Sequence, residues 1–236
     1  MAAAGAPELG MTYPDTYFTA RESWRDWRIE AGQLLDLAGV SYGMRVLEIG
    51  CGGGGLLRLL SGRGAVGIGV DVLQAALELA QRRDSGLQRL SLVCIGADGR
   101  LPIRDESFDA VIGQHVVEHI RDVDAVILEW KRVLAPGGRL ALATPNAQYP
   151  NPGHFADADH VHIYTPVELS RLVTQAGFQV EHCSTIFPFL SHQRALRAAG
   201  VMAYRAFRRL PYFDRHGRTI LLSAVKPSSH QNAGIN

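Results

Sequence analysis

A hydrophobic run leads into a row of glycines at Val46-Leu47-Glu48-Ile49-Gly50-Cys51-Gly52-Gly53-Gly54-Gly55, and an apolar helical pattern begins directly afterwards. This order predicts a strand, a tight turn and a helix. Glycine permits unusual backbone angles and lets a ligand approach the main chain, at a helix N-terminus whose free N–H groups bind polar atoms. Gly50, Gly52 and Gly55 also satisfy the GxGxxG spacing of dinucleotide-binding proteins, so this stretch alone leaves such an enzyme as an alternative.

Outward from this stretch, short β-type segments alternate with longer helical patterns. The expected strands are Arg45–Ile49, Val66–Val70, Leu90–Ile95, Ala110–Ile112, Leu140–Ala143, one that begins near Phe178, and Thr219–Val225. The expected helices are Arg21–Ala38, Leu56–Leu60, Leu73–Ala80, Val123–Leu134, one that starts at the Thr165-Pro166-Val167-Glu168 capping signal and ends at Gly177, and His192–Leu210. Repeated βαβ units predict an α/β fold whose parallel sheet is covered on both faces.

The length of 236 residues fits one domain with an insertion. We expect a flexible lead-in at residues 1–20, the domain at residues 21–227 with a helical insertion at about 188–218, and a loose tail at residues 228–236. The three cysteines are odd in number and widely spaced, and neither a signal peptide nor an apolar stretch of about 18 residues is present, so we expect a cytoplasmic protein.

The charge balance gives no general attraction to polyanions. The chain carries 24 basic and 23 acidic side chains, and it shows no second module of a nucleic-acid-binding type. We therefore expect a small-molecule substrate and no nucleic acid. No sequence feature assigns an oligomeric state.

Three carboxylates stand close to expected strand ends. Glu48 precedes the glycine turn, Asp71 follows the second strand, and Asp98 comes shortly after the third. An acidic side chain at Asp71 can accept both hydroxyls of a ribose, which suits NAD as well as S-adenosylmethionine (SAM). Glu48 and Asp98 are not needed by a dehydrogenase.

With these motifs in order, the chain resembles the class I SAM-dependent methyltransferases, particularly the branch of the ubiquinone-biosynthesis O-methyltransferases. The resemblance covers about residues 45–177. The motifs that carry it are Val-Leu-Glu-Ile-Gly-Cys-Gly-Gly-Gly, Gly-Val-Asp, Gly-Ala-Asp-Gly-Arg-Leu-Pro-Ile, Ser-Phe-Asp-Ala-Val, Val-Val-Glu-His-Ile and Arg-Val-Leu-Ala-Pro-Gly-Gly-Arg-Leu. The resemblance implies a Rossmann-like doubly wound sheet of seven strands, mostly parallel with the last antiparallel, and helices on both faces.

The resemblance also implies a cofactor site for SAM. Its methionine part would lie against Gly50 and Gly52, with Glu48 steering the amino group. Asp71 and the adjacent Val72 would hold the ribose. The remaining implied contacts are Asp98 and Gly99 at the adenine and Gln114 beside the methyl group.

Methyl transfer to a hydroxyl benefits from a general base, and histidine has a suitable pKa. We expect His115 and His119, which follow the fourth strand, as catalytic residues, and we assign no metal. An alternative is a divalent-metal site of His115, Glu118, His119 and His160. The small-RNA 2′-O-methyltransferases resemble this pattern, but they carry a further Glu where His115 stands.

The expected insertion helix is amphipathic and basic. Leu196, Ala203, Phe207 and Leu210 share one face, while five arginines lie on the other: Arg194, Arg197, Arg205, Arg208 and Arg209. This helix could rest on a lipid surface or cover a lipophilic substrate, as a related insertion does in the ubiquinone methyltransferases. A lid with a solvated arginine face is the alternative.

Aromatic residues near the N-terminus could form a wall over the acceptor or pack as core. These residues are Tyr13, Tyr17, Phe18, Trp24 and Trp27. The sequence thus predicts a SAM-dependent methyltransferase that transfers the methyl group to a hydroxyl group of a small, lipophilic molecule. The rival classes are an NAD-dependent oxidoreductase, which the turn at Pro136-Gly137-Gly138 also disfavours, and a SAM-binding protein without turnover.

Overall fold

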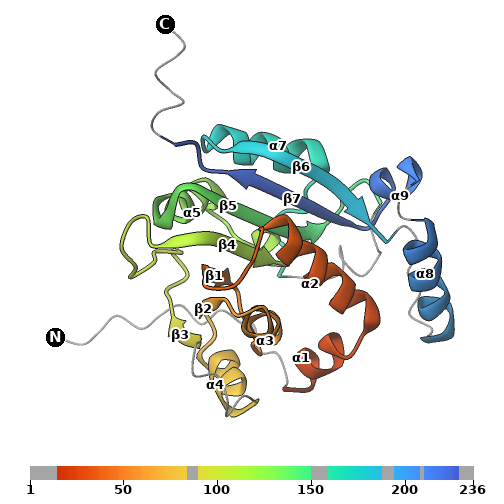
Figure 1. The fold of residues 1–236 in the computed structure, drawn as a ribbon, viewed down its shortest axis with the longest axis horizontal. Helices are drawn as coiled ribbons and strands as arrows, with labels where there is room; N and C mark the ends of the chain where they lie inside the picture. The colour runs from red at the N-terminus through yellow and green to blue at the C-terminus, as the bar shows by residue number, and fades with distance from the viewer. Residues whose placement is uncertain (1–14, 84–89, 150–158, 188–193, 208–209, 229–236) are drawn as a thin grey trace, which may run out of the picture.

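A twisted sheet of seven strands forms the centre of the protein (Figure 1). The computed structural model describes residues 15–83, 90–149, 159–187, 194–207 and 210–228. The strands are β1 (Arg45–Ile49), β2 (Val66–Asp71), β3 (Leu90–Cys94), β4 (Phe108–Gln114), β5 (Leu134–Pro145), β6 (Gln179–Ile186) and β7 (Thr219–Val225). Their order across the sheet is β3-β2-β1-β4-β5-β7-β6, and β7 alone runs antiparallel to its neighbours. The expected Rossmann-like sheet with an antiparallel last strand is confirmed.

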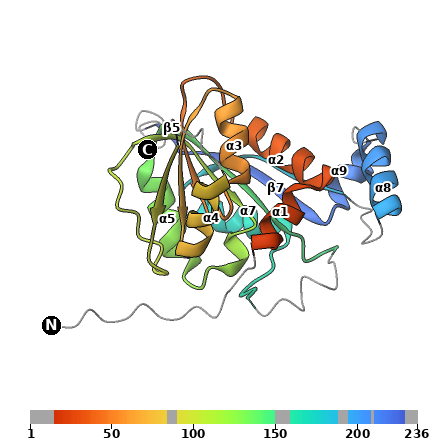
Figure 2. The same ribbon diagram turned by 90° about the horizontal axis from the view of Figure 1, so that it is seen from below.

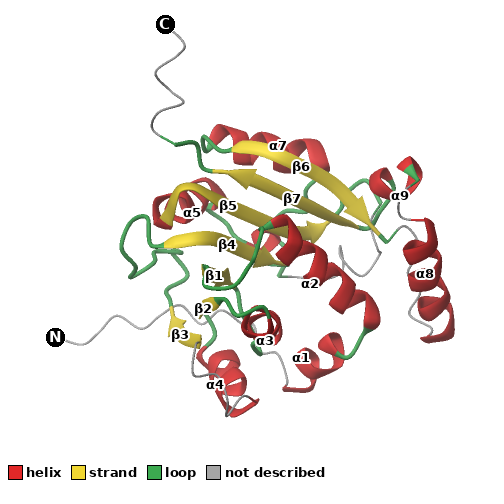
Figure 3. Cartoon of the chain, viewed as in Figure 1, coloured by secondary structure: helices red, strands yellow, loops and turns green. Residues whose placement is uncertain are grey.

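Helices cover both faces of the sheet (Figures 2 and 3). The described helices are α1 (Asp15–Glu22), α2 (Arg25–Leu37), α3 (Gly55–Gly62), α4 (Gln74–Arg83), the 3₁₀ turn η1 (Val117–His119), α5 (Val123–Val133), α7 (Pro166–Gln175), α8 (Arg194–Phe207) and α9 (Pro211–Arg215). Strand side chains alternate between the faces, so Val46 joins a core with α2, α3 and α4, while Leu47 joins a core with α5 and α7.

The N-terminal helix differs from its expected form. One helix was expected over Arg21–Ala38 after a lead-in at residues 1–20, but the structure has two helices, and the first begins at Asp15. The chain breaks at Trp24, which takes extended angles (φ −78°, ψ 139°), while the Ser23 hydroxyl donates to the Ala20 carbonyl and closes α1. Residues 1–14 of the expected lead-in and 229–236 of the expected tail lie outside the described residues.

The start of α7 follows its sequence signal closely. The Thr165 hydroxyl accepts from the Glu168 N–H at 3.2 Å, and the Glu168 carboxylate accepts from the Thr165 N–H at 2.8 Å, with Pro166 at the first helical position. The predicted capping box is therefore confirmed.

The insertion helix α8 packs on the domain through neither its expected apolar face nor a fully solvated arginine face. The expected apolar face is turned outward, since Leu196 is 56% and Phe207 52% exposed. Val201 and Tyr204 are buried instead, on the side of α8 that meets α2. Tyr204 binds Gln33 of α2. Arg208 and Arg209, which were expected on the basic face, lie outside the described residues, as do residues 188–193.

The sheet order reverses between β1 and β4, and this reversal places the site. From β1 the chain passes outward to β2 and β3 and then returns to β4 on the other side of β1. In open α/β sheets, ligands bind beyond the carboxyl ends of the strands at such a point. Gly50, Asp71 and Gln114 all lie at this edge.

Within the described ranges, no helix is long and apolar enough to cross a membrane. Cys51, Cys94 and Cys183 are free thiols.

Candidate functional site

The glycine turn after β1 requires glycine for two reasons. Gly50 and Gly52 have positive φ angles of 67° and 49°, which strain any other residue. A Cβ atom at Gly50 would lie 2.9 Å from Val116, and one at Gly52 would lie 2.6 Å from the ring of Phe18. Gly54 begins α3 in the left-handed conformation without a side-chain cap, which leaves N–H groups of the first turn for a polar ligand.

Asp71 braces this turn from the end of β2. Its Oδ2 accepts from the Gly52 N–H at 2.8 Å, and its Oδ1 accepts from the Leu73 N–H at 2.9 Å. Burial raises the pKa of the carboxyl group, although hydrogen bonds from the N–H groups of Leu73, Gly52 and Val72 oppose the shift. Each carboxylate oxygen has a second lone pair, so Asp71 can still accept from a ribose.

Glu48 is a buried carboxyl group beneath the turn. Its Oε2 has no hydrogen-bond partner. Burial raises its pKa well above the ordinary value; the charges of Asp71 and Glu22 add to the shift, and Arg58 opposes it. A buried oxygen without a donor fits a ligand that brings one. The amino group of SAM is such a donor, so Glu48 and the glycine cradle fit this cofactor.

The expected adenine contacts lie in the loop after β3. Gly99 has a φ of 70°, and its Cβ would clash with Val126. Asp98 is exposed, and its Oδ1 accepts from the Arg100 N–H at 3.3 Å. The loop after β3 is held beside the carboxyl end of β2, because the Ile95 N–H donates to the Asp71 carbonyl at 3.0 Å.

Helix α1 lies on the outside of the glycine turn, which the sequence did not predict. Its Glu22 pairs with Arg58 and, at 2.7 Å, with Arg83. Both arginines also donate to the Gly53 carbonyl, at 3.2 Å and 3.0 Å. This network fixes α1 to the turn and sets Phe18 against Gly52.

The other expected aromatic residues do not form one wall with Phe18. Trp27 is part of the core, and the Trp24 ring lies 3.8 Å from the Arg197 guanidinium of α8. Tyr17 packs edge-on against Phe18 at 5.3 Å. Tyr13 lies outside the described residues.

A buried carboxylate from α2 lies beside the end of β4, and the sequence analysis did not identify it. Glu30 of α2 is buried, and its Oε1 lies 2.8 Å from Gln114 Nε2 and 2.8 Å from His115 Nε2. His115 Nδ1 lies 3.4 Å from Glu118 Oε1 on its other side. Asp26 and Glu30 stand four residues apart beside the buried Trp27 and Ala31, a spacing that places acids on the covered face of a helix.

The two carboxylates control the charge of His115. Burial alone would lower the pKa of the imidazole, but Glu30 and Glu118 raise it to about 9, against the opposing charge of Arg21. The pKa of Glu30 falls to about 2 because His115 outweighs the opposite effect of burial. His115 is therefore protonated at neutral pH, with both ring nitrogens facing carboxylates.

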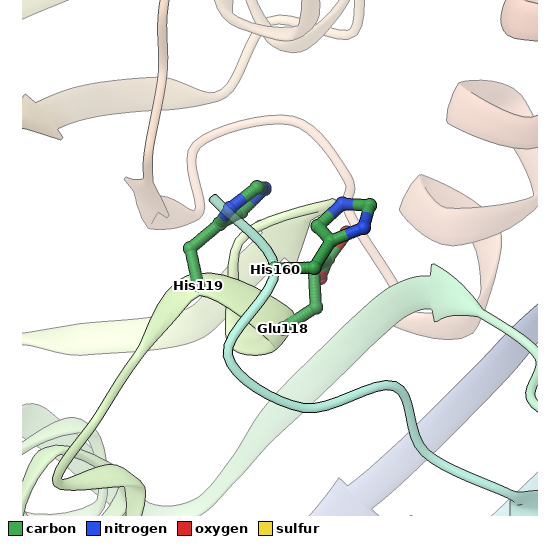
Figure 4. Close-up of side chains that lie close together, drawn as sticks. All are labelled: Glu118, His119 and His160. Carbon is green, nitrogen blue, oxygen red and sulfur yellow. The ribbon is translucent and has the colours of Figure 1, made fainter. Parts of the chain in front are cut away.

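A cluster of three potential metal ligands lies beside this pair (Figure 4). Glu118 and His119 come from η1, and His160 comes from a segment far along the chain. Their ligand atoms all lie within 4.8 Å of one another. Glu118 Oε2 accepts from the Thr144 hydroxyl at 2.9 Å, while its buried Oε1 satisfies no hydrogen bond. Of the expected set, the structure brings these three together, whereas His115 faces Glu30.

A glycine cradle and buried carboxyl groups at the carboxyl edge of a doubly wound sheet define a protein that binds a nucleotide cofactor. Comparison with known proteins identifies the family within this class. Residues 47–142 match the family model described as a methyltransferase domain. The chain is 34% identical to the ubiquinone biosynthesis O-methyltransferase of Dinoroseobacter shibae, over 71% of this chain and 73% of that protein. It is 30% identical to the demethylmenaquinone methyltransferase of Tropheryma whipplei, over 62% of this chain and 57% of that protein.

Solved structures agree on the fold. A SAM-dependent methyltransferase from Mesorhizobium loti has a TM-score of 0.67 at 19% identity, covering 86% of this chain and 99% of that one. Phosphoethanolamine N-methyltransferase 2 of Haemonchus contortus, in complex with SAM, has a TM-score of 0.68 at 20% identity, covering 92% and 58%.

The chain belongs to the class I SAM-dependent methyltransferases. It is an enzyme of this family, and SAM is its cofactor. These matches favour a methyltransferase over the NAD-dependent oxidoreductase and over a SAM-binding protein without turnover.

Proposed function

We propose that this enzyme transfers the methyl group of SAM to a hydroxyl group of a small, lipophilic molecule. The name of the Dinoroseobacter relative, a ubiquinone biosynthesis O-methyltransferase, supports this chemistry. The observation that carries the proposal is the orientation of His119, which lies just beyond the end of β4.

The ring of His119 is oriented so that its Nε2 is available to act as a base. Its Nδ1 lies 3.0 Å from the Asp159 carbonyl oxygen. A carbonyl only accepts hydrogen bonds, so Nδ1 carries the proton and Nε2 carries the lone pair. In the proposed reaction, Nε2 takes the acceptor's hydroxyl proton while the oxygen attacks the methyl group. His115, protonated and paired with Glu30, is unsuited to this step, and we propose that it has a positioning role instead.

Bound SAM supplies an electrophilic methyl group on a sulfonium, and the surrounding residues align it with the acceptor. We propose that the cofactor lies along the carboxyl edge of β3, β2, β1 and β4. The residues that we assign to it are Glu48, Gly50, Gly52, Asp71, Val72, Asp98, Gly99 and Gln114.

A second candidate is metal-assisted transfer to the same kind of hydroxyl. It is favoured by one observation, the group of Glu118, His119 and His160, in which Glu118 Oε1 makes no hydrogen bond, although it lies 3.4 Å from His115 Nδ1. A divalent cation held there would lower the pKa of an acceptor hydroxyl and orient it. The two candidates use His119 differently, as a base or as a ligand.

Transfer assays with catechols and quinols, with and without EDTA, separate the two candidates. If His119 is the base, His119→Asn lowers kcat by about 100-fold or more, the Kd for SAM is unchanged, and EDTA has no effect. If a metal acts, EDTA abolishes wild-type turnover and added Mg²⁺ restores it.

The matched control is His182→Asn, because His182 lies on β6 and binds Ser184 at 2.7 Å. Its activity is expected to equal that of the wild type. Full activity of His119→Asn in EDTA would contradict both candidates.

The acceptor's lipophilic character is proposed from helix α8. Its outward face carries Leu196 and Phe207, and Leu210 follows at 51% exposure. We propose that this face rests on a lipid surface from which the acceptor is drawn.

A further inference from the structure

Glu30 is the one side chain of α2 that reaches both Gln114 and His115. We propose that Glu30 is a positioning residue that holds the end of β4 in a strained conformation. In this way it sets the position of the glycine turn, where we place the cofactor, and of Gln114 and His115, which face the proposed methyl-transfer region. The inference rests on the proposed placement of SAM along this edge. Glu30 itself touches neither the cofactor nor the reacting atoms.

The strain lies in the backbone of His115. Its φ is +55°, in the left-handed region that a residue with a Cβ seldom adopts. Such a conformation persists only where the surroundings enforce it. The enforcing contacts are a backbone hydrogen bond from the His115 N–H to the Ala143 carbonyl at 2.7 Å and the two carboxylates, Glu30 and Glu118, on either side of the ring.

The turn at His115 determines where Val116 lies. The Val116 side chain fills the space between β4 and the glycine turn, since a Cβ at Gly113 would lie 2.8 Å from it and one at Gly50 would lie 2.9 Å from it. If the backbone of His115 relaxed, the Val116 side chain, which packs closely on both glycines, would have to shift relative to Gly50. The contact between Glu30 and His115 is thus transmitted to the turn that cradles the methionine part of SAM.

Gln114 is fixed by the same carboxylate. Its amide nitrogen donates to Glu30 Oε1, which sets the rotation of the amide plane at the end of β4. One oxygen atom therefore orders two consecutive residues that face the proposed methyl-transfer region.

Helix α2 is a rigid support for Glu30. Its Ala31 and Leu34 are fully buried in the core. One turn before Glu30, the Asp26 carboxylate binds Arg197 of α8, with Arg197 Nε 2.8 Å from Oδ1. Asp26 is as deeply buried as Glu30, at 6% exposure, but it faces α8 rather than the cofactor turn.

The test is the affinity for S-adenosylhomocysteine, measured by calorimetry, because this ligand binds without any acceptor. The result therefore does not depend on which atom is methylated. Glu30→Ala is expected to weaken binding about tenfold, because the strained turn at His115 relaxes without it and must be re-formed when the ligand binds. Glu30→Gln keeps an acceptor oxygen and is expected to weaken binding less than Glu30→Ala.

Two substitutions at His115 distinguish an effect on the backbone conformation of the turn from the loss of the imidazole ring itself. His115→Ala removes the ring contacts that enforce the turn but keeps a Cβ, which disfavours a φ of +55°. The backbone therefore relaxes, and binding weakens about as much as in Glu30→Ala. His115→Gly removes both, and glycine adopts a φ of +55° without strain. We therefore expect His115→Gly to bind several times more tightly than His115→Ala.

The matched control is Asp26→Asn. It neutralises a buried carboxylate of the same helix and lowers the melting temperature, but its affinity for S-adenosylhomocysteine is expected to stay within about twofold of wild type. Equal affinities of His115→Ala and His115→Gly, or a loss of affinity in Asp26→Asn as large as in Glu30→Ala, would overturn the proposal.

Discussion

Asp71 combines two roles in one carboxylate: it accepts from the backbone of the glycine turn, and we propose that it accepts from the ribose. Its oxygens lie 2.8 Å and 2.9 Å from two backbone nitrogens. We expect Asp71→Ala to raise the Kd for SAM by about 10- to 150-fold, since hydrogen bonds to charged groups contribute about 1.5–3 kcal/mol. Asp71→Asn keeps one acceptor oxygen and is expected to be intermediate. Calorimetry with SAM measures both.

Asp109→Asn is the control for Asp71. Asp109 accepts from the Arg45 N–H at 2.7 Å, at the opposite edge of the same strands. Its Kd for SAM is expected to match that of the wild type. Binding of NADH by the wild type, or an Asp71→Ala protein that binds SAM normally, would contradict the assignment.

The Glu30–His115 pair predicts how stability depends on pH. The pKa of His115 is raised to about 9, so its stabilising effect is complete below its ordinary pKa of 6.5 and is lost as the pH rises to 9. The pKa of Glu30 is lowered to about 2, so its effect is complete above 4.5 and is lost as the pH falls to 2. The stability advantage of wild type over Glu30→Gln should therefore be largest between pH 4.5 and 6.5.

Urea unfolding in EDTA at several pH values measures this advantage. EDTA keeps Glu118, the other carboxylate beside His115, free of metal. An advantage that is the same at pH 6 and at pH 9 would show that His115 is not charged by its neighbours.

The sequence singled out Gly50, Gly52 and Asp71, which the structure places together at one edge of the sheet, because backbone geometry and strand ends restrict the residue types there. It did not reveal Glu30, which lies 85 residues before His115. An acid within a helix ordinarily indicates a solvated face, and only the packing of α2 against the sheet shows that Glu30 points inward. A catalytic role was expected for His115 from its residue type, but its charge depends on two neighbours from different elements, and for that reason we propose a positioning role instead.

Helix α7 offers a test of an element whose start was predicted from sequence. Thr165→Ala removes the capping hydroxyl and is expected to lower the free energy of unfolding by about 1 kcal/mol. For a chain of this length, that corresponds to a melting temperature lower by about 2–4 °C. Differential scanning calorimetry measures the change.

A Thr→Ala substitution at Thr174, inside α7, is the control. The Thr174 hydroxyl donates to the Ser170 carbonyl one turn earlier on an exposed face. This back-bonding contributes little to a helix, so Thr174→Ala should leave the melting temperature nearly unchanged. An equal loss in both variants would mean that the capping box is not what stabilises the start of α7.

Element positions were predictable where periodicity and turn chemistry agree. Strand β1 has the expected bounds, and α7 begins at the expected proline. The break at Trp24 was not predicted, and the Trp24 ring there packs on Arg197 of a distant helix, a contact that the sequence does not show. Arg197 was expected on the basic face of α8, but it pairs with the buried Asp26 of α2, on the side of α8 where Val201 and Tyr204 are also buried.

The outward face of α8 predicts association with membranes. We expect the protein to sediment with vesicles of mixed phosphatidylcholine and phosphatidylglycerol, and Leu196→Asp and Phe207→Asp to abolish this. Binding of SAM by these variants should be unchanged, since helix α8 lies away from β1 and α3, which flank the glycine turn (Figure 1).

Leu128→Asp is the matched control for this surface. Leu128 lies on α5, on the other face of the sheet, and is 54% exposed, close to the 56% of Leu196. Its variant should sediment with vesicles as the wild type does. Equal loss of sedimentation in Leu128→Asp and Leu196→Asp would show that general apolar exposure, and not α8, drives the association.

The position of β7 also has a consequence for synthesis on the ribosome. Strand β7 lies between β5 and β6, although it is the last strand to be made. Until residues 219–225 emerge, the edge of β5 is open and β6 has no neighbour in the sheet. At about 5–20 residues per second, the interval from the end of β6 to the end of β7 lasts a few seconds. During that interval the nascent chain exposes the unpaired backbone N–H and C=O groups of β5, which can pair with another chain.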